Sequence, residues 1–256
     1  MSFTLSNLRT ERHGPHLLHL TPETDSNEIL GLLNQEGTVL KQTHKRLVRH
    51  VGSYVLKSRC DTGLLGTLRH TCLRATYRRG WDVALRLHEA GINVPKPRAL
   101  YETRWNGLIT GNVFISDYVP NLIPFWGSEF APVEGEVATA QIQASLKALS
   151  DAVKEVLDAG VYLRDLSRSN ILTKSGSDFY FVDLDDAELD VTYTRRRRMR
   201  NHFHLYRQFR MLWPRSTIEP FIRDLLPDSE PYEAWIEALE DNYASWSRQQ
   251  QDGNAP

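Results

Sequence analysis

The sequence predicts a two-lobed α+β fold, in which a β-rich first half is joined by a short connector to a helix-rich second half. Short runs of β-branched and aromatic residues dominate up to residue 116, whereas apolar residues recur at helical spacing beyond residue 122. The polar stretch DYVPNL contains a proline and is the expected boundary. We therefore divide the chain into a polar N-terminal segment (1–28), an N-lobe (29–116), a hinge (117–122), a C-lobe (123–248) and a polar tail (249–256).

The expected N-lobe contains strands on both sides of one long helix. The runs ILGLL, TVL, RLVRHV and SYVLKSR, between Ile29 and Arg59, suggest three strands, and RALYET and GLITGNVFISDYV suggest two more. The helix is predicted by residues that recur at steps of three and four and ends at Gly91. Its apolar stripe consists of Leu73, Tyr77, Trp81, Leu85 and His88.

The expected C-lobe begins with an amphipathic helix that ends at Gly160, a natural residue after a helix C-terminus. Two short strands, NILT and FYFVDL, follow, and the remainder is helical. The stripe of the first helix consists of Ile142, Leu146, Leu149, Val153 and Val156.

The composition gives no sign of a nucleic-acid-binding, disulfide-rich or membrane-spanning protein. The 256 residues include 41% hydrophobic and 25% charged side chains with a formal net charge of -1, so bulk charge does not suggest a nucleic-acid partner. Cys60 and Cys72 are too few for a disulfide framework and indicate reduced thiols. With no apolar leader and no apolar window of about 20 residues, we expect a soluble, cytoplasmic protein that is at most peripheral to a membrane.

The segment LRDLSRSNIL carries the first chemical signal. Asp165 precedes Asn170 by five residues, and Asp183 follows Asn170 by thirteen, at the end of the apolar strand FYFVDL. This spacing matches the catalytic loop and the metal-binding aspartate of kinases. One carboxylate would accept the proton of the attacking hydroxyl, and an amide oxygen with a second carboxylate would hold Mg²⁺ against the ATP phosphates. Asp165 fits the first role, and Asn170 and Asp183 fit the second; the alternative is that all three only form turns.

Lys57 supports the kinase hypothesis, because it lies in a predicted strand before the first long helix, as does the kinase lysine that contacts the α- and β-phosphates. A lysine at the end of a strand more often only faces solvent, so Lys57 gains weight from the three downstream residues. Asp117 and Val119, in the predicted hinge, are further residues expected to bind the nucleotide.

Several segments together resemble the bacterial lipopolysaccharide core kinase family, which includes the Kdo and heptose kinases. The resemblance covers roughly residues 35 to 215 and rests on LKQTHKRLVRHV, YVLKSR, HEAGINVPKPRALYE, DLSRSNIL and VDLD. It implies a protein-kinase-like fold that phosphorylates sugar hydroxyls of the lipopolysaccharide inner core with ATP and Mg²⁺. Carried over, it implies Lys57 on phosphate, Asp165 as base, Asn170 and Asp183 on metal, and a lipid-linked core oligosaccharide as acceptor.

The chain departs from the kinase pattern at three places. KQTHKR replaces the glycine-rich loop, so Lys41, Lys45 and Arg46 either contact phosphate or are solvated, and we favour solvation slightly. The helix glutamate that pairs with the kinase lysine has no clear counterpart, because the only acids between Lys57 and His88 are Asp61 and Asp82, and Gly80 lies near the expected position. Leu163 replaces the histidine of H-R-D and bears on loop packing.

A basic run opens a predicted amphipathic helix and consists of Arg195, Arg196, Arg197, Arg198 and Arg200. Either the arginines lie in water while an aromatic stripe docks the helix, or they face an anion. The second hypothesis suits a phosphorylated glycolipid or peripheral contact with the cytoplasmic face of the inner membrane.

Histidine spacing gives little support for a metal site. His13, His16 and His19 would approach one another only on a helix, and no cysteine or carboxylate completes the set. His202 and His204 point to different faces of a helix.

Two other functions stay open from the sequence. The missing glycine loop and helix glutamate also suit a pseudokinase-like regulatory or binding module. The catalytic residues do not identify the acceptor hydroxyl, which could belong to another small molecule or to a protein.

Overall fold

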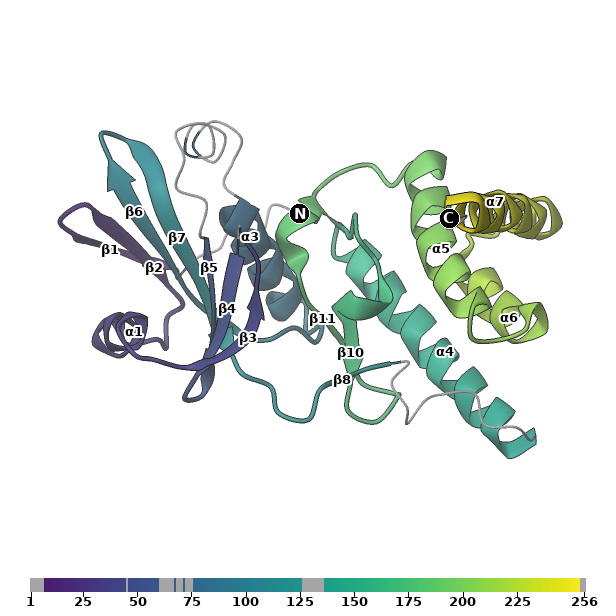
Figure 1. Ribbon diagram of the computed structural model, residues 1–256, viewed down its shortest axis with the longest axis horizontal. Coiled ribbons are helices and arrows are strands. Elements are labelled where there is room, and N and C mark those ends of the chain that lie inside the picture. The colour runs from purple at the N-terminus through teal and green to yellow at the C-terminus, as the bar shows by residue number, and fades with distance from the viewer. Residues whose placement is uncertain are drawn as a thin grey trace. The chain divides into compact units, whose positions relative to one another are not determined.

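The structure, a computed structural model, divides into two compact units. The first unit combines the chain up to Pro120 with Asp183–Asp186, and the second combines Asn121–Val182 with Ala187–Pro256 (Figure 1). The structure describes residues 7–44, 46–59, 67, 71, 76–125 and 136–253. The predictions for Lys45, Cys60, Asp61, Cys72 and Leu73 lie outside these residues.

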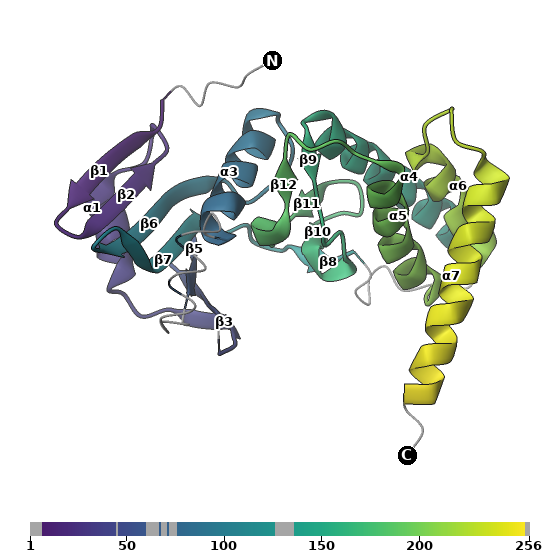
Figure 2. The same cartoon turned by 90° about the horizontal axis from the view of Figure 1, so that it is seen from above.

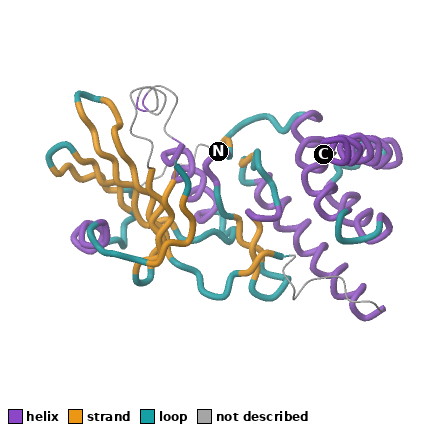
Figure 3. The backbone as a smooth tube through the Cα atoms, viewed as in Figure 1, coloured by secondary structure: helices purple, strands orange, loops and turns teal. Residues whose placement is uncertain are grey.

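The first unit is built on a seven-stranded sheet, whose strands are orange in Figure 3. Every neighbouring pair of strands is antiparallel. In sheet order the strands are β1 (Arg9–His13), β2 (His16–Leu20), β6 (Pro97–Trp105), β7 (Leu108–Asp117), β5 (Tyr54–Arg59), β4 (Arg46–Val51) and β3 (Thr38–Gln42).

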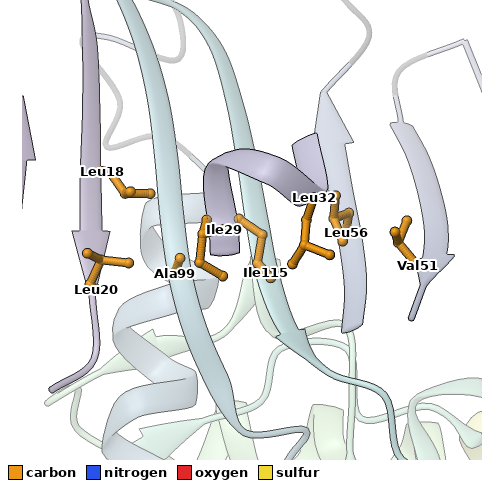
Figure 4. Packing of buried hydrophobic residues seen from close by; sticks show 8 residues of the cluster. All are labelled: Leu18, Leu20, Ile29, Leu32, Val51, Leu56, Ala99 and Ile115. Atoms are coloured by element: carbon orange, nitrogen blue, oxygen red, sulfur yellow. The ribbon is translucent and has the colours of Figure 1, made fainter. Parts of the chain in front are cut away.

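Helix α1 (Ser26–Leu33) covers one face of this sheet. Asp25 caps it by accepting a hydrogen bond from the backbone N–H of Glu28. Ile29 and Leu32 then pack on side chains from five strands (Figure 4). The strand residues of this core are Leu18, Leu20, Val51, Leu56, Ala99 and Ile115.

Helix α3 (Thr76–Glu89) covers the opposite face of the sheet. Successive side chains of a strand point to opposite faces, so neighbouring residues contact different helices. Ala99 faces α1, whereas Leu100, the next residue, packs with Tyr77 and Trp81 of α3. As predicted, the helix ends close to Gly91, whose φ of 77° suits glycine. Lys57 pairs with Phe114 in the register of β5 and β7, and Phe114 packs on the α3 core. Lys57 therefore lies on the face of the sheet that α3 covers.

The second unit is mainly helical (Figure 2). Its helices are α4 (Glu136–Asp158), α5 (Arg195–Arg210), α6 (Arg215–Leu225) and α7 (Tyr232–Gly253). Helix α4 packs on α6, and α5 packs on both α6 and α7. The predicted stripe of α4 is apolar and largely buried, with Leu146, Leu149, Val153 and Val156 in the core.

Short strands frame the loops of the second unit. One sheet joins β11 (Phe179–Phe181), β10 (Ile171–Thr173) and β8 (Ile123–Pro124), and another joins β9 (Val161–Tyr162) to β12 (Glu188–Leu189). The described residues also form two single-turn 3₁₀ helices: η2 (Arg168–Asn170) in this unit and η3 (Leu184–Asp186) in the first unit.

Two local predictions were wrong. The run ILGLL lies in helix α1, although the three strands that follow it form as expected. The N-terminal segment, expected to be only polar, contributes β1 and β2 to the sheet. His13 and His16 therefore pair across a hairpin, while His19 contacts Thr10.

None of the helices in the described part of the chain is long and apolar enough to cross a bilayer.

Candidate active site

Asp165 lies in the turn between β9 and η2, and buried leucines fix this turn. Leu163 and Leu166 are both buried, whereas Asp165 between them is exposed. Leu163 thus performs the packing role predicted for it where other kinases have histidine. The apolar anchors leave the carboxylate of Asp165 free to face solvent.

Asn170 orients Asp165 and keeps its own amide oxygen available. Nδ2 of Asn170 donates to the backbone oxygen of Asp165 at 3.1 Å and to Oδ2 of Asp165 at 3.2 Å. The backbone oxygen of Asn170 accepts the N–H of Val182 at 2.9 Å, so β10 and β11 hold the loop. Oδ1 accepts only a 3.3 Å hydrogen bond from Ser169 among the recorded contacts of the described residues. It is therefore the atom that fits a metal ion.

Asp183 follows β11 by two residues and adopts a left-handed backbone conformation with φ of 55°. Aspartate tolerates this region better than most residues with a Cβ atom. The turn at Asp183 brings its Oδ1 to 2.5 Å from Nζ of Lys57. The structure thus joins two of the predicted residues in the first unit, as it joins Asp165 and Asn170 in the second.

Lys57 has a second acidic partner that the sequence did not predict. Nζ of Lys57 lies 2.7 Å from Oδ2 of Asp185, on η3, and 5.6 Å from the ring centroid of Tyr77. The side chain of Asp185 is only 2% exposed, compared with 29% for Asp183. Lys57 is therefore held between a buried carboxylate and a half-buried one.

Arg46 completes this group of charges. Its Nη1 lies 3.4 Å from Oδ1 of Asp183 and 3.5 Å from Oδ2 of Asp185. Our preference for a solvated Arg46 was wrong, because β4 places the residue beside β5 and its side chain reaches both carboxylates. Two cations and two carboxylates give this cluster no formal net charge.

The two carboxylates differ in their electrostatics. Burial would raise the pKa of Asp183, but the charges of Lys57 and Arg46 outweigh it and lower that pKa. Deeper burial raises the pKa of Asp185, an effect that Lys57 only partly offsets. Asp183 is thus kept ionised at neutral pH, as a ligand of a hard divalent cation must be.

Each unit carries donor types that suit a magnesium-bound nucleotide. Mg²⁺ prefers carboxylate and amide oxygens. Asp183 provides a carboxylate in the first unit, and Asn170 provides an amide oxygen in the second. Lys57 and Arg46 offer positive charge of the kind that stabilises phosphates.

The sequence model of one family, described as "Lipopolysaccharide kinase (Kdo/WaaP) family", matches residues 24–225, which is well over half of the chain. The chain belongs to the lipopolysaccharide kinase (Kdo/WaaP) family. As in that family generally, it is a phosphotransferase with an alcohol group as acceptor.

This Kdo/WaaP chain has the kinase-like α+β fold that the sequence predicts, as its match to a solved WaaP structure shows. A structure described as WaaP in complex with acyl carrier protein matches with a TM-score of 0.62 and 18% identity, covering 92% of this chain and 98% of that one. A granulovirus kinase, PK-1 of Cydia pomonella granulovirus, matches with a TM-score of 0.41 and 14% identity, covering 64% and 58% of the two chains. No curated protein sequence matches the chain.

The predicted hinge residues of this Kdo/WaaP chain lie at and just beyond the end of β7. Both carboxylate oxygens of Asp117 accept hydrogen bonds from Arg98, at 2.6 and 2.9 Å, and its N–H donates to the backbone oxygen of Lys96. Val119 is half-buried in the following turn. The side chain of Asp117 is thus already committed within the protein.

Three arginines of the basic run have partners within the second unit. Arg195 and Arg198 both pair with Glu230, and Arg197 pairs with Glu188 at 2.8 Å. Arg196 and Arg200 are exposed, and no ion pair is recorded for them among the described residues. The run is therefore divided between structural arginines and surface arginines.

Proposed function

We propose that the chain transfers the γ-phosphoryl group of Mg-ATP to a sugar hydroxyl of the lipopolysaccharide inner core, on Kdo or heptose. Membership of the Kdo/WaaP family supports a glycan acceptor. The structural observation that carries the assignment is that Nδ2 of Asn170 donates to both the backbone oxygen and the carboxylate of Asp165. In this proposal, Oδ1 of the same amide binds the metal ion.

Asp165 serves as the base in this proposal. It orients the acceptor hydroxyl and takes its proton while the hydroxyl oxygen bonds to the γ-phosphorus and the bond from that phosphorus to the β–γ bridging oxygen breaks, releasing ADP. Bound ATP supplies the phosphoryl group, and Mg²⁺ neutralises charge on the phosphates. Asn170 and Asp183 would hold the metal ion.

Lys57 contacts the phosphates, and Asp117 and Val119 contact the nucleotide base in this proposal. Because Arg98 occupies the carboxylate of Asp117, these hinge contacts fall to backbone atoms. Arg46 lies beside the same carboxylates as Lys57 and is a second candidate for phosphate contact.

We place the reaction at the cytoplasmic face of the inner membrane, where ATP and a lipid-linked acceptor are both available. Arg196 and Arg200 are the arginines we assign to anionic lipid or acceptor phosphate, because the other three are paired with glutamates. Each such arginine near an anionic surface contributes about 1 kcal/mol.

The test is incubation of the protein with Mg-ATP and a defined inner-core oligosaccharide, followed by mass spectrometry. We expect a gain of one phosphate on Kdo or heptose, matched by ADP release. ADP release only with other small molecules or with proteins would exclude the inner-core sugar and identify one of these as the acceptor. The absence of any ATP-dependent thermal stabilisation, with or without Mg²⁺, would instead support a pseudokinase-like module.

A further inference from the structure

We propose that Asp185 is the acidic residue that positions Lys57 for the nucleotide, in place of a glutamate on helix α3, and that Gly80 is required because it leaves room for Asp185. The nucleotide-binding part of this inference rests on the proposed function. The pairing of Lys57 with Asp185 is testable in the protein alone.

The first argument is the empty position on α3. In protein kinases a helix glutamate pairs with the strand lysine that contacts the α- and β-phosphates. Here that helix presents Gly80, and a Cβ atom added there would lie 2.9 Å from Oδ1 of Asp185. Its next nearest neighbours, at 3.6 and 3.7 Å, are backbone atoms of Asp185. Asp185 therefore fills the space in which a side chain of α3 would otherwise lie.

The second argument is the rigidity of Asp185. The residue belongs to the single turn η3, which packs against α3, and its side chain is 2% exposed. Its Oδ2 lies 2.7 Å from Nζ of Lys57. A buried carboxylate at this distance from an ammonium group restricts the lysine more strongly than an exposed one, because water screens it less.

The third argument separates the two carboxylates by role. Asp183 is 29% exposed and lies in the position expected for a metal ligand, so its contact with Lys57 is replaceable when a metal binds. Asp185 is enclosed and keeps its contact with Lys57 whether or not a metal ion is bound. Asp183 thus suits the role of metal ligand, whereas Asp185 suits the role of partner for Lys57.

The direct test measures the exposure of Lys57 in the absence of nucleotide. The side chain of Lys57 is 14% exposed, so its acylation by an amine-reactive reagent, followed by peptide mass spectrometry, should be slow. We expect Asp185→Asn to accelerate the labelling of Lys57 severalfold. The matched control is Asp186→Asn, next in sequence and exposed, which should leave the labelling rate unchanged. Equal labelling of Lys57 in the wild-type protein and Asp185→Asn would overturn the pairing.

The functional test separates nucleotide binding from chemistry. Loss of a buried ion-pair partner should raise KM for ATP about tenfold or more in Asp185→Asn. In the Lys57→Ala background the same substitution should add little, because the residue acts through Lys57. Additive losses would show that Asp185 supports the fold generally and would sink the proposal.

Gly80 provides a second route if Asp185→Asn folds poorly. Gly80→Ala should also raise KM for ATP and the labelling of Lys57, because its Cβ displaces Oδ1 of Asp185. The combined variant Gly80→Glu with Asp185→Ala moves the acid to α3, as in protein kinases, and should recover part of the ATP affinity lost in Asp185→Ala. Wild-type labelling and KM in Gly80→Ala, or no recovery in the folded combined variant, would count against the inference.

The two proposals fail in different ways. If the wild-type protein does not bind ATP but Lys57 labelling still depends on Asp185, the proposed function fails and the pairing stands. If the wild-type protein phosphorylates its acceptor and Asp185→Asn does so with an unchanged KM for ATP, the positioning role fails and the proposed function stands.

Discussion

Nδ2 of Asn170 lies 3.2 Å from Oδ2 of Asp165 and donates a hydrogen bond to it. A second hydrogen bond from the same nitrogen reaches the backbone oxygen of Asp165 at 3.1 Å. Two bonds from one amide group hold both the loop backbone and the carboxylate. In the proposed function Asp165 is therefore oriented before the acceptor binds, and positioning of this kind is a main source of rate enhancement in phosphoryl transfer.

Asp165→Asn should lower kcat by about 10²- to 10⁴-fold, the usual contribution of a positioned base. Asparagine keeps the shape and can still accept from Asn170, but it cannot take the acceptor proton. Thermal stabilisation by Mg-ATP should persist, which shows that the loss is in chemistry. Asp241→Asn, an exposed aspartate on α7, is the matched control and should retain wild-type turnover. Wild-type kcat in Asp165→Asn would refute the assignment of the base.

Asp183→Asn should abolish the part of the ATP-dependent thermal shift that requires Mg²⁺ while leaving the unliganded protein folded. Asparagine tolerates the left-handed backbone at φ of 55° but brings no negative charge to the metal. The free energy of unfolding of Asp183→Ala should be about 1 kcal/mol smaller than that of Asp183→Asn, since alanine is strained in this backbone conformation. A full Mg²⁺ response in Asp183→Asn would exclude Asp183 as a metal ligand.

The sequence predicted the residues whose spacing is local. Asp165 and Asn170 lie in one loop and are joined by a hydrogen bond, and a flanking apolar strand leads directly to Asp183. The acidic partners of Lys57 could not be predicted in this way. Asp185 reaches Lys57 because η3 packs on α3 at Gly80. No periodicity or motif in the sequence predicts this tertiary contact. The one signal in the sequence was the glycine near the expected glutamate position. It indicated that the helix glutamate is missing, but not that Asp185 replaces it.

The N-terminal third shows why short apolar runs are ambiguous. ILGLL has five residues, which suits a strand or a helix turn equally well by periodicity. The decisive signal is Asp25, whose carboxylate accepts from the N–H of Glu28 and starts α1. β1 was missed because it is an edge strand composed mainly of charged residues. β2 was missed because HLLHL is a short run in which histidines interrupt the leucines, although Leu18 and Leu20 are buried in the core.

Arg197→Ala should destabilise the protein by about 1–2 kcal/mol, whereas Arg196→Ala should stay within about 0.5 kcal/mol of wild type. Arg197 donates to Glu188 on β12 and to the backbone oxygen of Thr192, and its guanidinium lies 5.1 Å from the ring centroid of Tyr162 on β9. It therefore ties α5 to the strand that leads into the Asp165 loop. Urea unfolding of both variants measures the difference, and equal stabilities would show that the whole run is merely solvated.

The double variant Arg196→Ala with Arg200→Ala should bind anionic vesicles more weakly by about 2 kcal/mol at low salt, and binding to neutral vesicles should be unchanged. Co-sedimentation with vesicles that contain phosphatidylglycerol measures this. The reason is the exposure of both arginines, which leaves their charge available to phosphate. If the double variant binds anionic vesicles as the wild type does, membrane contact through this run is excluded.

His202 should make the folded state sensitive to mild acid. It is 2% exposed, and Nδ1 accepts a hydrogen bond at 3.1 Å from Nε1 of Trp235, which is fully buried. Burial, with a smaller contribution from the charge of Arg198, lowers the pKa of His202 to about 3 from a value of 6.5 when exposed. Below pH 6.5 the unfolded chain therefore binds a proton that the folded chain does not.

The sign of the effect follows from that difference: the stability contributed by neutral His202 is complete above pH 6.5 and is lost as pH falls toward 3. Between pH 7 and pH 5 the loss should be about 2 kcal/mol. His202→Gln removes the titration, so its free energy of unfolding should vary less with pH by that amount, even if the variant is less stable throughout. His44→Gln, at an exposed position, is the control for the loss of an imidazole and is unfolded under the same conditions. Urea unfolding at several pH values gives the slopes, and a wild-type slope in His202→Gln would mean that His202 does not remain neutral in the folded protein.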